Sequence, residues 1–134
     1  MENEEMIGAA IRAREMAVAP YSNFKVGAVA VTAEGKVYTG CNVENSTYGL
    51  TMCAERVAIF KALSEGAHDI VKVVVVADTP QPCYPCGACR QIIWDFAPKA
   101  EVVCANLTNE SIVFKAGDLI PYAFGDGDLT NSKK

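Results

Sequence analysis

Two short segments of the sequence carry side chains that can hold a metal ion. They are Cys53-Ala54-Glu55 and Pro85-Cys86-Gly87-Ala88-Cys89, and each opens a stretch with helical character. Cys86 and Cys89 are three positions apart, so on a helix they share one face and can bind one ion. The positive ends of two helix N-termini favour the thiolate form of cysteine, which zinc requires. The spacing predicts a zinc site with Cys53, Cys86 and Cys89 as ligands.

Cys83 decides whether such a site is open or closed. Three thiolates leave one coordination position for water, as in catalytic zinc sites, whereas a fourth thiolate closes the shell of a structural site. Pro85 interrupts any helix between Cys83 and Cys86, so the three neighbouring cysteines do not line one helical face. We expect the open site, with the closed four-cysteine site and a redox-active cysteine pair as the alternatives.

Glu55 is the candidate for proton transfer. A glutamate at the start of a helix is by itself an ordinary surface residue that complements the helix dipole. The combination of Cys-x-Glu with a downstream Pro-Cys-x-x-Cys changes this interpretation, because together they form the zinc-deaminase pattern, with Cys53 where other members have histidine. We therefore predict that Glu55 is a catalytic acid and base.

Composition and charge exclude several classes of protein. The chain has 134 residues, of which 51% are hydrophobic and 21% charged, which suits one packed domain. Its formal net charge of -4 argues against tight binding to nucleic acid or to an anionic membrane. The acidic residues 1–5 lack the layout of a secretory signal, and the apolar stretch 73–77 is too short to span a bilayer. We expect a cytoplasmic protein with no membrane or nucleic-acid partner.

The chain has six cysteines, an even number that raises the question of a disulfide framework. Such frameworks belong to small secreted domains that lack a core, and this chain has a core pattern and no secretion signal. In a reducing compartment we expect metal ligands and buried apolar thiols instead. Cys41 and Cys104 are predicted to be buried residues at strand ends.

The remaining pattern predicts the elements that position the two cysteine segments. Helices are expected over residues 4–19, 51–63 and 87–96, and strands over residues 26–31, 37–41, 70–77, 101–105 and 111–114. Pro20 should end the first helix, and Thr51 and Gly66 should cap the second. This alternation indicates an α/β fold, a single-domain three-layer α-β-α sandwich around a mixed sheet of about five strands. Residues 1–124 form the predicted catalytic domain, and residues 125–134 a loosely ordered tail.

Over nearly its whole length the sequence resembles the short cytidine deaminases of pyrimidine salvage. The resemblance rests on motifs that occur in the order and spacing of that family. These motifs are Pro20-Tyr21-Ser22-Asn23-Phe24-Lys25-Val26-Gly27-Ala28, Gly40-Cys41-Asn42-Val43-Glu44-Asn45, Cys53-Ala54-Glu55-Arg56, Pro85-Cys86-Gly87-Ala88-Cys89-Arg90-Gln91 and Leu119-Ile120-Pro121-Tyr122-Ala123-Phe124. The resemblance implies a cytidine deaminase-like fold and one Zn²⁺ per subunit, held by Cys53, Cys86 and Cys89.

The resemblance also implies a reaction. A zinc-activated hydroxide attacks the carbon of cytidine or 2′-deoxycytidine that bears the amine, and uridine or 2′-deoxyuridine and ammonia result. Glu55 acts as the proton shuttle between water, the pyrimidine ring nitrogen and the leaving amine. Asn42 and Glu44 hold the ribose 3′-hydroxyl, Phe24 packs on the base, and backbone near Ala54 meets the base carbonyl. Without the resemblance, Asn42, Glu44 and Phe24 read as ordinary loop or core residues.

Family members of this length are homotetramers with shared active sites, so the resemblance implies a homotetramer here. Tyr48 and Phe124 match positions that contribute to a neighbour's pocket in that family. The sequence departs from the usual family pattern at Tyr84, Tyr122 and Trp94. Tyr84 and Tyr122 fall near the expected pocket or its lid, and these departures do not affect the assignment of the zinc ligands or of Glu55.

Arg56 is assigned a role from charge. Three thiolates on Zn²⁺ give the site a formal charge of about -1, which weakens the acidification of bound water. We expect Arg56 to compensate by donating hydrogen bonds to the thiolates. Two other functions are considered beside the deaminase of free nucleosides: a deaminase of a modified cytosine nucleoside and, less favoured, a non-catalytic structural zinc module.

Overall fold

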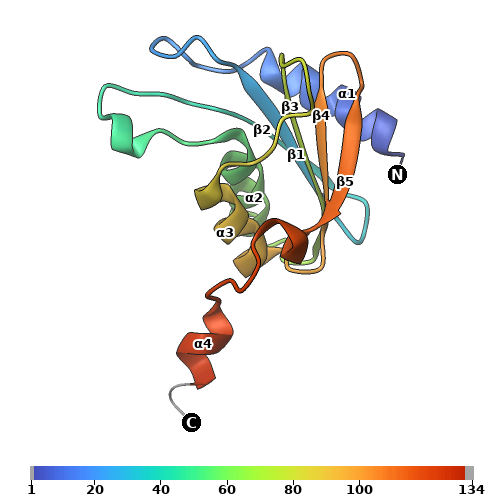
Figure 1. Ribbon diagram of the computed structural model, residues 1–134, viewed down its shortest axis with the longest axis vertical. Coiled ribbons are helices and arrows are strands. Elements are labelled where there is room, and N and C mark those ends of the chain that lie inside the picture. Colours follow the sequence, from blue (N-terminus) through green and yellow to red (C-terminus); the bar gives the residue numbers. More distant parts are fainter. Residues whose placement is uncertain (1, 132–134) are drawn as a thin grey trace.

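The structure of residues 2–131, a computed structural model, has one five-stranded sheet with helices on both of its faces (Figure 1). The strand order is β2-β1-β3-β4-β5, and only the β3–β4 pair is parallel. The elements in chain order are α1 (Asn3–Arg14), β1 (Val26–Thr32), β2 (Val37–Cys41), the 3₁₀ turn η1 (Tyr48–Leu50), α2 (Ala54–Ser64), β3 (Ile70–Ala77), α3 (Gly87–Phe96), β4 (Glu101–Asn106), β5 (Ser111–Lys115), the 3₁₀ turn η2 (Ala116–Leu119) and α4 (Asp126–Asn131). The mixed, three-layer α/β architecture that the sequence predicted is confirmed.

The central strand β3 shows why the sheet is covered on both sides. Alternate residues of a strand point to opposite faces, so a run of consecutive valines needs a core on each face. Val73 and Val75 pack in the cluster that includes α2 and α3, and Val74 and Val76 pack against α1. All four valines have no exposed surface. The apolar run therefore places α1 on one face and the two cysteine-bearing helices on the other.

Glycine at position 40 sets how closely α2 approaches the sheet. A methyl group on Gly40 of β2 would lie 2.4 Å from the carbonyl oxygen of Ala54 and 2.6 Å from the backbone nitrogen of Ala58. Both contacts are with helix backbone, which cannot move aside cheaply. The absence of a side chain at Gly40 thus seats the first turn of α2, with Ala54 and Glu55, directly on the strand.

Two predicted helix boundaries are wrong, and both errors have the same cause. The first helix ends at Arg14 rather than near Ala19, because Val18 leaves the helix and pairs with the loop at Val43. The N-cap residue of α2 is Cys53 and not Thr51. Met52 is paired with Val43 from the other side, which keeps the chain extended up to Cys53. In both cases pairing with Val43 overrides the local helical pattern.

The end of α2 and the C-terminal segment complete the description. Gly66 has the positive φ of 87° expected of a helix-ending glycine, which confirms its role. Where the sequence predicted a loose tail, residues 126–131 instead form α4. The N–H of Gly125 donates to Asp128 Oδ2 at 2.8 Å and caps the start of this helix. Residues 132–134 of that predicted tail lie outside the described residues. In the described part of the chain, no helix is long and apolar enough to cross a membrane.

Candidate active site

The N-terminal ends of α2 and α3 meet and bring three cysteine sulfurs together. Cys53 and Cys86 are the N-cap residues of the two helices, and Cys89 lies in the first turn of α3. The three Sγ atoms all lie within 4.8 Å of one another, and Cys53 Sγ is 3.8 Å from Cys86 Sγ. A tetrahedral zinc ion with Zn–S distances of about 2.3 Å holds its sulfurs about 3.8 Å apart. The donor set and its spacing therefore fit zinc.

The charges around the sulfurs favour a thiolate at Cys53. The pKa of Cys53 is lowered to about 5, because Cys89 donates a hydrogen bond to its sulfur and Arg56 does the same. Arg56 Nη2 lies 3.1 Å from Cys53 Sγ, as the charge argument from the sequence anticipated. The hydrogen bond from Cys89 to Cys53 raises the pKa of Cys89, and burial and the charge of the Cys53 thiolate also disfavour a second thiolate there. A cation shared by the sulfurs removes that conflict.

Cys83 is not part of the sulfur cluster. Among the described residues, the groups close enough together to share one metal ion are those of Cys53, Cys86 and Cys89. Burial raises the pKa of Cys83 to about 11, so this thiol stays protonated at neutral pH. Three protein ligands leave one coordination position open, which is the arrangement of catalytic zinc sites.

Glu55 lies next to the sulfurs in the first turn of α2 and is 3% exposed. Burial, together with the negative charge at Cys53, raises the pKa of its carboxyl to about 7. A carboxyl with a pKa near neutrality both accepts and releases protons readily at physiological pH. The environment of Glu55 is therefore that of a general acid and base.

A pocket of about 250 Å³ opens over this cluster. It brings together residues from the segment before β1, the loop after β2, the start of α2 and the segment before α3. They are Ser22, Phe24, Val26, Asn42, Glu44, Thr51, Cys53, Ala54, Glu55, Cys83, Tyr84 and Cys86. Phe24, Asn42, Glu44 and Ala54, the substrate-binding residues predicted within one chain, thus share one cavity with the sulfurs.

Asn42 connects the two segments that form the polar side of the pocket. Its side-chain amide donates from Nδ2 to the carbonyl of Phe24 at 2.8 Å, and its Oδ1 accepts from the N–H of Val26 at 2.9 Å. These bonds hold the backbone on either side of Lys25 against the loop after β2. Asn42 therefore positions the Phe24 segment, a role that the sequence alone did not indicate.

Glu44 is held as an oriented carboxylate. Its Oε1 accepts from the N–H groups of Tyr21 at 3.0 Å and Ser22 at 3.1 Å, and its Oε2 accepts from the hydroxyl of Ser22. The hydrogen bond from the Ser22 hydroxyl is the main reason that the pKa of Glu44 lies below its ordinary value. Sequence reasoning did not single out Ser22, although it stands in the Pro20–Ala28 motif, four positions before the first residue of β1.

Tyr48 and Phe124 do not reach the pocket of their own chain. Tyr48 is 71% exposed and packs edge-on against Tyr21, with ring centroids 5.2 Å apart. Phe124 is 59% exposed and lies in the segment between η2 and α4. Neither side chain lines the cavity over the sulfurs.

Comparison with known proteins agrees with this geometry. The family model described as the cytidine and deoxycytidylate deaminase zinc-binding region matches residues 1–115. The chain is 46% identical over 132 residues to the cytidine deaminase of Halalkalibacterium halodurans, covering 98% of this chain and 100% of that protein. It is 44% identical over 131 residues to the cytidine deaminase of Sporosarcina psychrophila, covering 97% and 96% of the two chains.

Comparison with solved structures leads to the same family. A crystal structure of cytidine deaminase from Burkholderia pseudomallei superposes with a TM-score of 0.90 at 51% identity, covering 92% of this chain and 100% of that one. The model of the zinc-binding region spans both segments that supply the sulfur cluster, Cys53-Ala54-Glu55 and Pro85–Cys89. The chain therefore belongs to the zinc-dependent cytidine and deoxycytidylate deaminase family.

Proposed function

We propose that this protein catalyses the hydrolytic deamination of cytidine and 2′-deoxycytidine to uridine and 2′-deoxyuridine, with release of ammonia. The observation that carries the proposal is the buried carboxyl of Glu55 beside three clustered cysteine sulfurs, at the base of a pocket. Relatives that match over nearly the full chain are cytidine deaminases, which supports the same substrate class. The net charge of -4 favours a free nucleoside over a polynucleotide.

Cys53, Cys86 and Cys89 hold the zinc ion in this proposal. A zinc ion held by three ligands lowers the pKa of water toward neutrality and so supplies a nucleophile. Arg56 offsets part of the negative charge of the thiolates through its contact with Cys53 Sγ. The hydrogen bond from Arg56 also orients the Cys53 sulfur toward its neighbours.

Glu55 moves the protons of the reaction. Water adds its oxygen to the carbon that bears the amine, and Glu55 takes the released proton and delivers it to the adjacent ring nitrogen. The new hydroxyl on that carbon then gives its proton through Glu55 to the amine nitrogen. The carbon–nitrogen bond breaks as the hydroxyl becomes a carbonyl, and ammonia leaves. The sum is cytidine plus water giving uridine plus ammonia. A carboxyl with its pKa near 7 suits both directions of transfer.

The remaining pocket residues position the nucleoside. Phe24 packs on the base, and backbone at Ala54 meets the base carbonyl. Asn42 and the ionised Glu44 hold the ribose 3′-hydroxyl. Glu44 suits this role because its carboxylate is already oriented by the backbone of Tyr21 and Ser22 before substrate arrives.

We further propose that the protein is a cytoplasmic homotetramer whose active sites are completed by neighbouring subunits. Tyr48 and Phe124 are the residues assigned to a neighbour's pocket. Their large exposure and their absence from the pocket of their own chain support this assignment. Leu50, in the same 3₁₀ turn as Tyr48, is also an exposed apolar side chain of the kind that a subunit interface covers.

The test is a spectrophotometric cytidine assay on the wild type and Glu55→Gln, with the zinc content of both determined. We expect wild-type turnover, and a loss of at least about 100-fold in kcat in Glu55→Gln with zinc retained. This result separates proton transfer from metal binding. A native mass measurement on the same samples tests the tetramer.

Two outcomes would redirect the assignment. A fully zinc-loaded wild type without activity on cytidine or deoxycytidine would favour a modified cytosine nucleoside as substrate. A fully active monomer would contradict the shared sites.

A further inference from the structure

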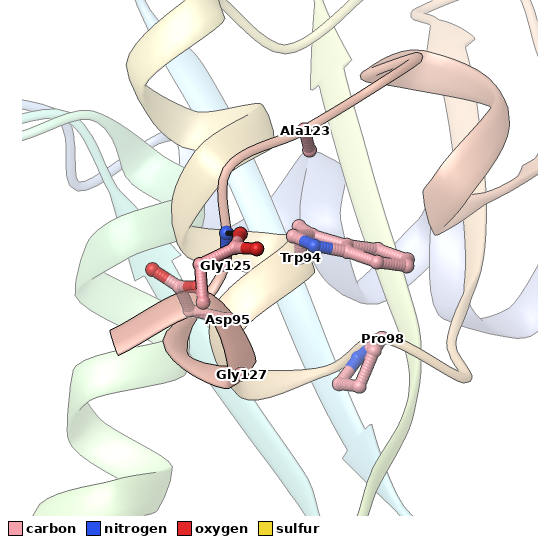
Figure 2. A pocket seen from close by; sticks show the side chains of 7 residues that line it. Trp94, Asp95, Pro98, Ala123, Gly125 and Gly127 are labelled. Carbon is pink, nitrogen blue, oxygen red and sulfur yellow. Dashed lines mark hydrogen bonds between the residues drawn. The ribbon is translucent and has the colours of Figure 1, made fainter. Parts of the chain in front are cut away.

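Trp94 of α3 supports the segment that carries Phe124. A methyl group on Gly125 would lie 3.1 Å from Trp94 Nε1, and one on Gly117 would lie 3.4 Å from Trp94 Cζ3. The backbone of the C-terminal segment therefore lies against the indole at two places, on either side of Phe124. Figure 2 shows the indole between Pro98 and Ala123, with the Gly125 segment at its nitrogen-bearing edge.

Hydrogen bonds from the same helix hold the segment in place. Gln91 Nε2 donates to the carbonyl of Phe124 at 2.7 Å, and Arg90 Nη1 donates to the carbonyl of Leu119 at 3.1 Å. Gln91 and Trp94 are three positions apart, so they present neighbouring side chains on α3. The helix that begins with two of the zinc ligands thus also fixes residues 119–125.

The held segment presents its aromatic side chains outward. Between Leu119 and Gly125 the chain turns at Tyr122, which has a φ of 57°, a conformation that costs a non-glycine residue energy unless its surroundings impose it. The side chains of Tyr122 and Phe124 remain exposed. An exposed aromatic on a fixed backbone is pre-organised for a contact outside its own chain.

We propose that Trp94 is a positioning residue for Phe124, and that its effect on catalysis falls on the active site of the neighbouring subunit. This inference rests on the proposed function, in which Phe124 completes a neighbour's pocket. Trp94 itself does not line the pocket over the sulfurs, which Glu55 does line. Its removal should therefore raise KM in the neighbouring site and leave zinc content unchanged.

The test uses mixed oligomers made by co-expressing two differently tagged chains and purifying on both tags. In the first mixture the wild type is combined with Glu55→Gln, and in the second it is combined with a chain that carries both Glu55→Gln and Trp94→Leu. Only wild-type chains then have a working Glu55. We expect KM for cytidine to be about fivefold higher in the second mixture, with kcat per working site within about twofold.

Two further variants guard against misfolding and nonspecific effects. Gly125→Ala replaces Trp94→Leu as the second change and displaces the segment from the other side, at a half-buried loop position just before α4. Phe96→Leu is the matched control, because Phe96 is an aromatic of the same helix that packs against Phe60. We expect Gly125→Ala to raise KM in the mixture and Phe96→Leu to leave it unchanged.

The outcomes separate the two proposals. If the protein is a tetramer but the two mixtures have equal KM, and Gly125→Ala also leaves KM unchanged, the positioning role of Trp94 is overturned. The proposed function is then unaffected. A rise in KM in the Trp94→Leu homo-oligomer but not in the mixture would show that Trp94 acts on its own site, which also overturns the inference. A monomeric and fully active wild type would overturn this inference together with the shared sites.

Discussion

Arg56 Nη2 lies 3.1 Å from Cys53 Sγ. Cys53 is the N-cap residue of α2, and Arg56 lies three positions later in the first turn of the same helix. The guanidinium thereby reaches back to the N-cap sulfur, and its second contact is the carbonyl of Thr51 at 3.5 Å. The helix N-terminus and the guanidinium both place positive charge at the thiolate of Cys53. This pairing lets a site built from three cysteines and no histidine remain close to charge-balanced.

Replacing Arg56 by Gln should weaken zinc binding. The change removes the hydrogen bond and the positive charge at Cys53, and changes to such supporting groups typically cost about 10- to 100-fold in metal affinity or activity. Competition with a chromogenic chelator measures the affinity, beside kcat for cytidine. Lys61→Gln removes one positive charge from the same helix, near Thr39, and is the control. Unchanged affinity and rate in Arg56→Gln would remove its assigned role.

Replacing Cys83 by Ser should leave one zinc ion bound per chain, whereas Cys86→Ser should lower the zinc content. Cys86 belongs to the sulfur cluster, and Cys83 is a protonated thiol in the wall of the pocket. Metal analysis of the two purified variants compares their zinc content. The two cysteines lie only three positions apart in the same segment, so each variant is the control for the other. Zinc loss in Cys83→Ser equal to that in Cys86→Ser would point to a closed four-cysteine site.

Replacing Gly40 by Ala should destabilise the protein and disturb the site together. The added methyl group meets the backbone of α2 at Ala54 and Ala58, and overpacking of this kind costs about 1–3 kcal/mol in the free energy of unfolding. Urea unfolding measures that loss. Zinc content should also fall, because the first turn of α2 moves away from α3.

Gly49→Ala is the matched control, since a methyl group there has nothing within 4 Å. Equal unfolding midpoints for the two variants would contradict the close approach of α2 to β2.

The state of Glu44 predicts how KM depends on pH. Its pKa is lowered from the ordinary value of 4.5, mainly by the hydrogen bond from the Ser22 hydroxyl, so the carboxylate persists to lower pH than usual. The contribution of the charged Glu44 carboxylate to nucleoside binding is therefore complete above pH 4.5. It is lost as the pH falls through the lowered pKa of Glu44. KM for cytidine should consequently be insensitive to Glu44 titration near neutrality.

Ser22→Ala removes the largest cause of the lowered pKa. The rise in KM with acid should then begin at a higher pH than in the wild type, and KM measured from pH 7 downward tests this. Glu44→Gln should raise KM by about tenfold or more at neutral pH, since the proposed contact of Glu44 with the ribose 3′-hydroxyl loses its charge. Superimposable KM profiles for Ser22→Ala and wild type would contradict the control of Glu44 by Ser22.

The fold was largely predictable because its signals are local. The β-branched run at β3 needs a core on both faces, and Gly66 needs a positive φ, so both could be placed from residue type alone. The bounds of β2, β3 and α3 agree with the predicted ones. The start of α2 was misplaced because Thr51 is a good cap by type, while the pairing of Met52 with Val43 is a contact between segments that propensity does not encode.

The sequence by itself determined the chemistry of the site, because residue types and short spacings fix which ligands and which acid are available. Cys86 and Cys89 share a helical face at any tertiary arrangement, and Glu55 follows Cys53 by two residues. Only the tertiary structure decided that Cys53 meets Cys86 while Cys83 stays apart, because these relations depend on how α2 and α3 pack on the sheet. Burial of Glu55, and with it the shift of its pKa toward neutrality, likewise arises only when those helices close over it.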